Sequence, residues 1–303
     1  LDFAYMANAE VAAVAKEIVA QHYGKPAGHS YFAGCSTGGR EGMILSQRYP
    51  TVFEGIISGD PAMRTGLSNL TIGRWIPIAF NQVAPKDAHG KPLIEQSITD
   101  NDRKLIMDAL MKRCDTKDGV ADGMISDPLA CDFDPERLVC KGATSDSCLA
   151  AEKAAAIKRA LAGPHTSGGT QVYPGFLYDA GIASGTPLRG LLSPGPGIFG
   201  PAPTDLTLDV DKEAANGGLE TVANWSQFYF VPGMSHCAGG PALDQFDLLG
   251  AMVNWVEKGI VPPSVTATGK AFPGRSRPLC PYPKHAHYKG QGASEDVNNF
   301  ECR

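Results

Sequence analysis

The segment around Ser36 constrains the fold more than any other part of the sequence. A short aromatic run at residues 30–33 leads into Gly34-Cys35-Ser36-Thr37-Gly38, and a helical pattern follows over residues 39–49. A second apolar run covers residues 53–58. The order of strand, tight turn, helix and strand predicts a parallel sheet in an α/β fold.

The rest of the chain adds helices at both ends and an interruption between them. Apolar residues recur at helical spacing over residues 7–23 and again over 246–257, and a run of aromatic residues predicts a further strand at 225–232. Between residues 63 and 200 the alternation of strand and helix fails, and turns rich in Asp, Gly and Pro replace it. This change predicts an inserted domain.

Charge and hydropathy exclude two classes of partner. The net charge is -5 and no basic run could neutralise a row of phosphates, so nucleic acid is not an expected partner. No stretch approaches the roughly 18 apolar residues that span a bilayer, so no membrane span is expected. The chain opens with Leu1-Asp2-Phe3, and we expect any targeting segment to have been removed already.

The cysteines predict disulfides and an oxidising compartment. Their number is even and no CxxC pair occurs, which argues against a zinc ribbon or a thioredoxin motif. Disulfides are typical of secreted or periplasmic proteins. The alternative is a set of buried free thiols in a cytosolic enzyme. The eight cysteines are Cys35, Cys114, Cys131, Cys140, Cys148, Cys237, Cys280 and Cys302.

Ser36 stands in a GxSxG string in the context that a nucleophile elbow needs, after a predicted strand and before a predicted helix. In such an elbow the glycines avoid clashes on a strained turn. The alternative is an ordinary glycine-rich turn.

A coincidence of neighbours adds weight to the elbow. Cys35 immediately precedes Ser36, and Cys237 immediately follows His236. If these cysteines are bonded, their Cα atoms lie about 5.5–6 Å apart, and the adjacent residues about 3.8 Å further along each chain. His236 could then act as the general base for Ser36, with the Thr37 N–H facing the oxyanion of an ester substrate. The alternative is a capping or core histidine, with Cys237 paired elsewhere.

Four aspartates, Asp115, Asp118, Asp122 and Asp127, fall within 13 residues. Their mutual repulsion favours a hard cation, and Ca²⁺ accepts carboxylates together with turn carbonyls. A plausible ligand set is Asp115, Asp118 and Asp122 with the carbonyls of Val120 and Met124. The spacing is not that of an EF-hand, so a solvated acidic turn is the alternative.

Three segments together resemble the tannase and feruloyl esterase family: GCSTGGREGM, CDTKDGVADGMISDP and VPGMSHCAGGPALDQFD. The resemblance implies an α/β-hydrolase fold with an inserted lid domain, nucleophile Ser36, base His236 and a disulfide between Cys35 and Cys237. It also implies a structural Ca²⁺ held by Asp115, Asp118, Val120, Asp122 and Met124, and local disulfides Cys114–Cys131, Cys140–Cys148 and Cys280–Cys302.

The domain boundaries follow from the resemblance and from the interruption. We expect a catalytic core from residues 1–62 and 201–303, and a lid domain with the calcium loop from residues 63–200. Two departures from the family pattern predict an incomplete core. Residues 209–215 run straight into 216–219 where relatives carry the aspartate that orients the histidine, so no triad acid is assigned. Relatives also carry further residues before the start, including the second oxyanion donor.

The resemblance therefore implies a secreted or periplasmic serine carboxylesterase that hydrolyses esters of aromatic acids, of feruloyl or galloyl type, through an acyl-enzyme. A small aromatic ester is the expected partner. The alternative is a catalytically silent, calcium-stabilised remnant of the family that lacks the triad acid and part of the oxyanion hole.

Overall fold

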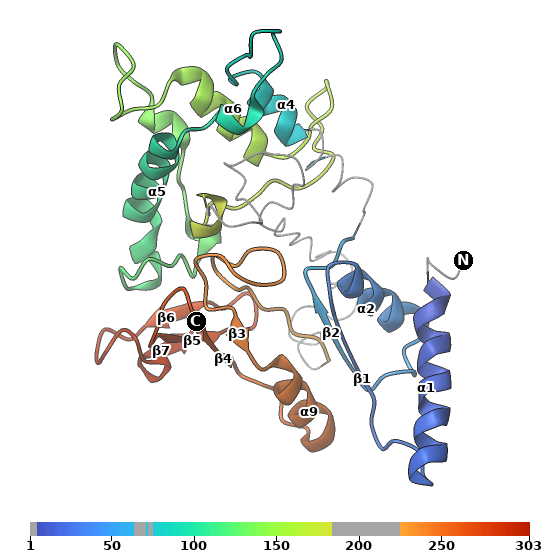
Figure 1. The fold of residues 1–303 in the computed structure, drawn as a ribbon. Coiled ribbons are helices and arrows are strands. Elements are labelled where there is room, and N and C mark those ends of the chain that lie inside the picture. Colours follow the sequence, from blue (N-terminus) through green and yellow to red (C-terminus); the bar gives the residue numbers. More distant parts are fainter. Residues whose placement is uncertain (1–4, 64–70, 72–74, 184–224) are drawn as a thin grey trace. The chain divides into compact units, whose positions relative to one another are not determined.

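The computed structural model describes residues 5–63, 71, 75–183 and 225–303 (Figure 1). These residues belong to two compact units. The first unit comprises Leu1–Arg64 and Asp247–Pro262, and the second unit comprises Thr65–Phe246 and Pro263–Arg303. Within the described ranges, no helix combines the length and the apolar character needed to cross a lipid bilayer.

The first unit is built on a two-stranded parallel sheet, as the sequence predicts. Strand β1 (Tyr31–Cys35) pairs with β2 (Gly55–Gly59) from end to end, and α2 (Thr37–Arg48) connects them and packs on both strands. Helix α1 (Ala7–Tyr23) precedes β1, and α9 (Leu248–Lys258) packs against β2 (Figure 1). The predicted helices and strands of this unit are therefore confirmed, with boundaries shifted by at most two residues.

Side chains tie the sheet of the first unit to its helices. Ser58 Oγ donates to the Gly39 carbonyl of α2 over 2.8 Å, and Tyr31 Oη donates to Glu257 Oε1 of α9 over 2.9 Å. The ring of Phe32 packs 5.6 Å from that of Phe53, centroid to centroid. These contacts fix α2 and α9 on the sheet, and with them the turn at the end of β1.

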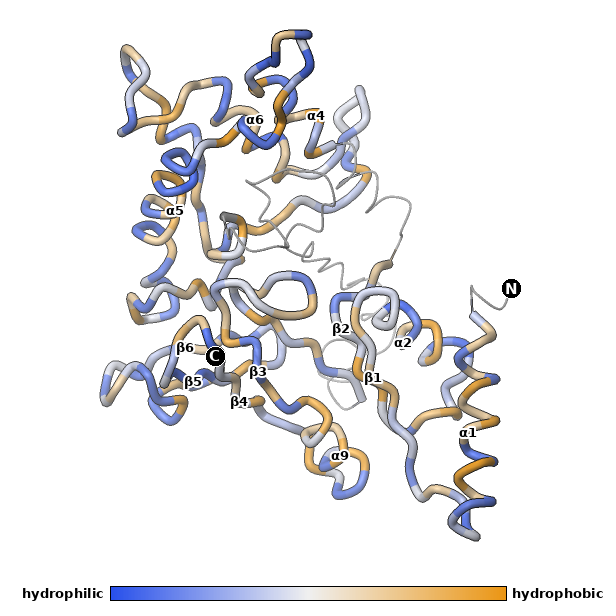
Figure 2. The backbone as a smooth tube through the Cα atoms, in the orientation of Figure 1, coloured by the Kyte–Doolittle hydropathy of each residue, from blue (hydrophilic) through white to orange (hydrophobic). Residues whose placement is uncertain are grey.

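Helix α1 forms where its period predicts, but part of its apolar face is not covered. Val11, Val14 and Ile18 are 66%, 61% and 60% exposed, and Figure 2 shows hydrophobic residues along this helix. The spacing of apolar residues thus predicts the helix correctly. The apolar face of a surface helix usually packs on the core, but Val11, Val14 and Ile18 do not.

The second unit begins with a helical core. Helices α4 (Ile76–Asn81), α5 (Asp100–Cys114) and α6 (Ala151–Leu161) surround a large cluster of buried side chains. Short 3₁₀ turns connect them. The 3₁₀ turns are Ile94–Gln96, Asp115–Asp118, Pro128–Ala130, Pro135–Leu138, Ala180–Ala183 and, near the C-terminus, Val297–Asn299. The buried core residues include Phe80, Ile98, Ile106, Leu110, Ile125, Leu149, Ile157 and Ile182.

Two small antiparallel sheets complete the second unit. The first has the order β3 (Gln245–Phe246), β4 (Val265–Thr268) and β5 (Ser276–Leu279), and the second pairs β6 (Ala286–Tyr288) with β7 (Phe300–Cys302). Three disulfides close local loops, with Cα–Cα distances of 5.2, 5.0 and 5.5 Å. They join Cys114 to Cys131, Cys140 to Cys148 and Cys280 to Cys302.

The prediction of a strand at residues 225–232 is wrong. The structure forms only an isolated bridge there, between Tyr229 and Pro281. A strand needs a neighbour along its whole length, whereas here the rings of Phe228 and Phe230 pack edge-on against Tyr282. The division into a core (1–62 and 201–303) and a lid (63–200) stays a prediction, and residues 184–224 lie outside the described part of the chain.

Candidate active site

Ser36 lies on a strained turn between β1 and α2. Its φ of 61° is a conformation that L-residues rarely adopt, and it occupies the N-cap position of α2. The Ser36 N–H donates to the Gly59 carbonyl over 3.0 Å, and the Ser36 carbonyl accepts from Arg40 N–H and Ala62 N–H over 3.0 and 3.2 Å. Backbone hydrogen bonds to β2 and α2 therefore hold the serine in this conformation.

Two glycines make the turn possible, and they are not the pair that the string suggests. A Cβ added at Gly34 would lie 2.6 Å from the Gly38 carbonyl oxygen, and one added at Gly39 would overlap the Gly59 oxygen and lie 2.9 Å from Pro61 Cα. At Gly38 an added Cβ would meet nothing within 4 Å. The steric requirement thus falls on Gly34 and Gly39. We call residues 34–39 the Ser36 turn.

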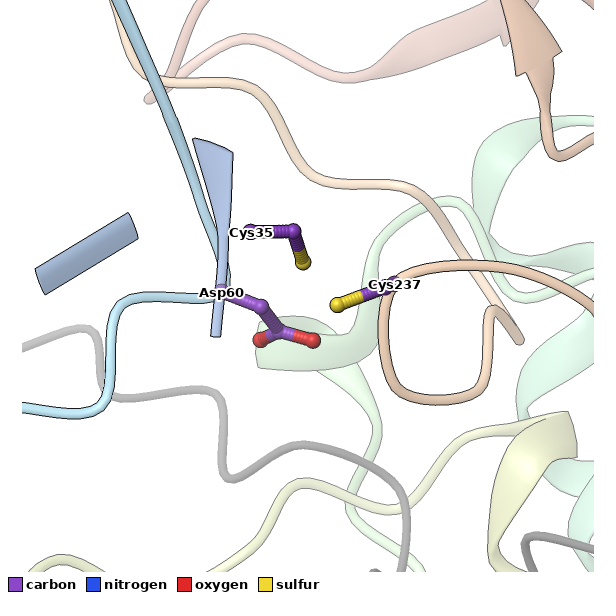
Figure 3. A group of neighbouring side chains, drawn as sticks. All are labelled: Cys35, Asp60 and Cys237. Atoms are coloured by element: carbon purple, nitrogen blue, oxygen red, sulfur yellow. The ribbon is translucent and has the colours of Figure 1, made fainter. Parts of the chain in front are cut away.

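Asp60 is a residue that the sequence analysis passed over. It follows directly after β2, and Figure 3 shows its side chain beside that of Cys35, at the ends of the adjacent parallel strands. A carboxylate oxygen of Asp60 lies within 4.8 Å of Cys35 Sγ. The available signal was the Gly59-Asp60-Pro61 string, because the carboxyl ends of parallel strands are where α/β folds place their sites.

Backbone strain is concentrated at a few positions. In the described ranges, the non-glycine residues with positive φ are Ser36 at 61°, Asp60 at 47° and Cys237 at 65°. Such conformations cost free energy and persist only where the surrounding structure enforces them, and they gather at functional sites. Ser36 is the candidate nucleophile, and Cys237 directly follows the candidate base His236.

His236 lies in the second unit, on a compact loop of residues 231–244 that we call the His236 loop. Within it Ser235 N–H donates to the Gly239 carbonyl over 2.9 Å, and Gly239 N–H donates to Asp244 Oδ2 over 2.7 Å. Gly233 N–H donates to the carboxylate of Asp179, whose pKa is raised by burial. The loop is therefore shaped by its own backbone and by two aspartates.

The cysteines beside Ser36 and His236 are both oxidised. All eight cysteines lie in the described ranges, and none of them is a free thiol. Cys35 and Cys237 are each disulfide-bonded. Ser36 belongs to the first unit and His236 to the second, so the pairing of these side chains stays a prediction.

The acidic loop, residues 115–127, lies entirely in the second unit. Asp115 accepts hydrogen bonds from the N–H groups of Asp122 and Gly123 over 3.1 Å each. Asp118, only 2% exposed, accepts from Ser126 N–H over 3.2 Å. Burial raises the pKa of Asp115 and brings that of Asp118 to about 6, and the Asp122 charge adds to both shifts. The carboxylates thus converge in a desolvated loop.

Two arginines from the C-terminal part of the chain reach this loop. Arg277, which is 2% exposed, forms an ion pair with Asp122 Oδ2, and the Arg275 guanidinium lies 3.8 Å from the same oxygen. The Arg277 guanidinium also stacks 4.0 Å above the ring of Phe300. The sequence analysis missed these contacts because Arg277 is far from the loop in sequence.

Comparison with protein families gives one match over most of the chain. The model of the family described as tannase and feruloyl esterase matches residues 1–188 and 210–303. The chain is 32% identical over 412 residues to a mono(2-hydroxyethyl) terephthalate hydrolase of Piscinibacter sakaiensis, covering 100% of the chain and 68% of the relative. It is 27% identical over 382 residues to a probable feruloyl esterase B-2 of Aspergillus terreus, covering 99% and 71%.

Solved structures share the fold. Feruloyl esterase B from Aspergillus oryzae superposes with a TM-score of 0.76 at 24% identity, covering 100% of the chain and 75% of that structure. A tannin acyl hydrolase from Aspergillus niger superposes with a TM-score of 0.72 at 20% identity, covering 99% and 69%. At these identities the likeness establishes the fold alone.

Proposed function

The chain belongs to the tannase and feruloyl esterase family of carboxylic ester hydrolases, and we propose that it hydrolyses esters of aromatic acids by a serine mechanism. The observation that carries the proposal is the Ser36 turn, in which a serine with positive φ joins a strand to a helix. This is the geometry of a nucleophile elbow, which exposes the hydroxyl at the carboxyl edge of the sheet.

The proposed acylation uses Ser36 and His236. The Ser36 oxygen forms a bond to the ester carbonyl carbon while His236 accepts the hydroxyl proton. The tetrahedral intermediate then collapses, the bond to the alcohol oxygen breaks, and the alcohol leaves with the proton from His236. The product of this step is an acyl-enzyme on Ser36.

Deacylation repeats these steps with water. A water molecule gives a proton to His236 as it attacks the acyl carbon, and the free acid leaves as the Ser36 oxygen takes that proton back.

Thr37 is the first residue of α2, and its N–H is one of the N-terminal amides that have no partner within the helix. We assign this N–H to the oxyanion, because a helix N-terminus favours negative charge.

We further propose that Cys35 and Cys237 are bonded to each other. The other six cysteines pair locally, and none of the eight is free, so these two remain as partners. The bond would place the residues next to them, Ser36 and His236, close together. It would close a loop of about 200 residues, worth roughly 5 kcal/mol in the chain-entropy model.

The aromatic acyl group is proposed from the relatives. The names of two relatives refer to a feruloyl ester and to a terephthalate ester, and these are the substrates named for those relatives.

The catalytic core is proposed to be an α/β-hydrolase, with the lid domain of residues 63–200 shaping the substrate pocket. Disulfides support a secreted or periplasmic location, because they persist in oxidising compartments.

A structural Ca²⁺ in the acidic loop fits the residues present. Asp118 offers a buried carboxylate and Asp115 a half-buried one, both are repelled by the charge of Asp122, and a cation would relieve the repulsion. With the carbonyls of Val120 and Met124 they would complete the ligand set. Bound there, calcium would supply charge neutralisation and rigidity to the loop and no chemistry to the ester. Asp122 would share its charge between the cation and Arg277.

The calcium proposal is tested by thermal unfolding with and without a chelator. A ligand present at 100 times its Kd stabilises the folded state by about 2.7 kcal/mol, so the chelator should lower the midpoint. Asp118→Asn should abolish this response. The exposed Asp132, just beyond Cys131, gives the matched control Asp132→Asn, which should keep the response. A midpoint that does not respond to chelator would remove calcium from the proposal.

The serine mechanism is tested with methyl ferulate, methyl gallate and a nitrophenyl ester. Ser36→Ala should abolish the hydrolysis of each of these esters that the wild-type protein hydrolyses. The matched control is Ser46→Ala on the exposed side of α2, where the hydroxyl donates to the Met43 carbonyl, and it should leave the rate unchanged. Absence of any hydrolysis that depends on Ser36 would instead favour the catalytically silent remnant.

A further inference from the structure

A pocket lies within the second unit, and we call it the Asp127 pocket. Its walls come from the segments 124–129, 230–232 and 277–286, and all of the described residues that line it belong to that unit. Neither Ser36 nor His236 is among them. The pocket therefore joins the end of the acidic loop to the stretch that enters the His236 loop and to the stretch that follows β5.

The Asp127 pocket is small and open on one side. It encloses about 40 Å³, whereas a cavity of roughly 150 Å³ is needed to hold benzene. The lining residues Leu129, which is 54% exposed, and Lys284, which is also exposed, mark the side open to solvent. A small functional group can therefore enter the pocket, while a ring that carries this group stays at the mouth.

Three aromatic side chains form a cluster at this pocket. The rings of Phe228 and Phe230 pack edge-on with their centroids 5.0 Å apart, and the Tyr282 ring lies 6.2 and 5.9 Å from them. Phe230 and Tyr282 line the pocket, and Phe228 is 38% exposed. Aromatic rings favour edge-on or offset contacts with further rings. The cluster thus offers such a contact to an aromatic ligand.

The polar groups of the pocket include both a hydrogen-bond acceptor and donors. Asp127 and His285 are only 22% and 24% exposed, and Asp127 Oδ2 lies 3.9 Å from His285 Nδ1. This separation is too long for a hydrogen bond, so the hydroxyl of a ligand can bond to both atoms at once. Lys284 adds an ammonium group, which can only donate.

The balance of charge in the pocket favours a neutral ligand group. The lining residue Arg277 is paired with Asp122, so its charge is already compensated. Asp127 would repel a carboxylate, and Lys284 would repel an ammonium group. A phenol hydroxyl can donate and accept, and it stays neutral near pH 7 because the pKa of a phenol is about 10.

We propose that the Asp127 pocket is a binding site for a phenol ring. The phenol hydroxyl enters the pocket, donates to Asp127 Oδ2 and accepts from Lys284 or His285. The ring lies at the mouth against Phe230 and Tyr282. This site does not depend on the proposed serine mechanism, because neither Ser36 nor His236 is among the described residues that line it.

The proposal is tested by titrating the wild-type protein with 4-fluorophenol and following the fluorine signal by NMR. We expect saturable binding. In 4-fluoroanisole a methyl group replaces the hydroxyl hydrogen, so this analogue cannot donate to Asp127 and should bind about tenfold more weakly. The anion 4-fluorobenzoate should also bind more weakly than 4-fluorophenol, because Asp127 repels it.

Variants locate the binding. Lys284→Met removes the ammonium group from an exposed position, where folding should not suffer, and should weaken binding of 4-fluorophenol by about fivefold. Phe230→Leu removes one ring of the cluster and should weaken binding by about threefold. The matched controls are the exposed Lys270→Met and Phe133→Leu, which packs on Tyr178. Neither control residue lines the pocket, so both should leave binding unchanged.

The outcomes decide the proposal without reference to ester hydrolysis. Absence of saturable binding up to about 10 mM 4-fluorophenol overturns it, as does equal binding of 4-fluoroanisole. Tighter binding of 4-fluorobenzoate overturns the choice of a neutral phenol. Binding that Lys284→Met leaves unchanged lies elsewhere in the protein and overturns the site, whether or not Phe230→Leu folds. Loss of Ser36-dependent hydrolysis would overturn the proposed function and leave this site untouched.

Discussion

The Ser36 turn and the acidic loop are both short motifs next to a cysteine, yet different forces hold them. The Ser36 turn is fixed by its backbone, through hydrogen bonds of Ser36 with Gly59 and Ala62 and through close approaches at Gly34 and Gly39. The acidic loop is fixed by side-chain charge, because its carboxylates accept N–H groups of the loop and Asp122 pairs with Arg277.

The difference decides how far each motif depends on the rest of the chain. The backbone hydrogen bonds and close approaches described above for the Ser36 turn join residues 34–62, a stretch that runs from β1 through α2 to just past β2. The acidic loop depends on Arg277, which arrives 155 residues later along the chain on β5. Steric constraints within one supersecondary unit are encoded locally, whereas charge compensation can be supplied from anywhere in the sequence.

The strongest test of this contrast is Arg277→Gln in the presence of a chelator. We expect the free energy of unfolding to fall by about 3–5 kcal/mol, because the buried Asp122 would keep its charge and lose its partner. Chemical denaturation followed by circular dichroism measures the change. The matched control is Arg113→Gln, which breaks an ion pair with the exposed Asp132 and should change stability little. Equal effects of the two variants would show that burial of the Arg277 pair does not matter.

The Ser36 turn is tested by adding one methyl group. Gly39→Ala places a Cβ against the Gly59 oxygen and Pro61 Cα, so we expect a loss of about 3 kcal/mol from overpacking, with loss of any ester hydrolysis. Gly38→Ala is the matched control, because its Cβ would meet nothing within 4 Å and alanine favours the helix by about 1 kcal/mol. If both variants lose stability equally, the close approach to β2 is not what holds the turn.

The same contrast explains what the sequence could predict. Helices α1, α2 and α9 and strands β1 and β2 each follow from periodicity and turn residues, and the structure has them within a few residues. The stretch 225–232 has the composition of a strand but forms only one bridge, because a strand also needs a partner that lies elsewhere in the chain. The composition of a segment predicts its tendency to form a strand, and the segments that lie beside it in the fold decide whether the strand forms.

The candidate site divides in the same way. Ser36, Thr37 and the acidic loop were found from short strings whose spacing carries the chemistry. Asp60 was missed because its significance comes from the register of two strands, which places it beside the end of β1. Arg277 was missed because nothing near it in the sequence indicates a buried partner.

A third prediction concerns α5, the helix that leads into the acidic loop, and asks whether charge also stabilises its start. At the start of α5, Asp102 and Thr99 form a capping box, and Lys153 donates to the same carboxylate. Burial alone would raise the pKa of Asp102, but the hydrogen bonds from Lys153 and Thr99 hold it below its ordinary value. A carboxyl group whose pKa is lowered on folding stabilises the protein above its unfolded pKa of about 3.9.

Asp102→Asn should therefore cost about 1–2 kcal/mol at pH 7, and the difference from wild type should shrink as the pH falls below about 4. Denaturation curves at a series of pH values measure this difference. Asp108→Asn, in an exposed pair with Lys104 on the same helix, should show a much smaller difference. The loss in Gly39→Ala should not vary with pH, because it is steric. A pH-independent cost for Asp102→Asn would mean that the helix start is held by the shape of the cap and not by its charge.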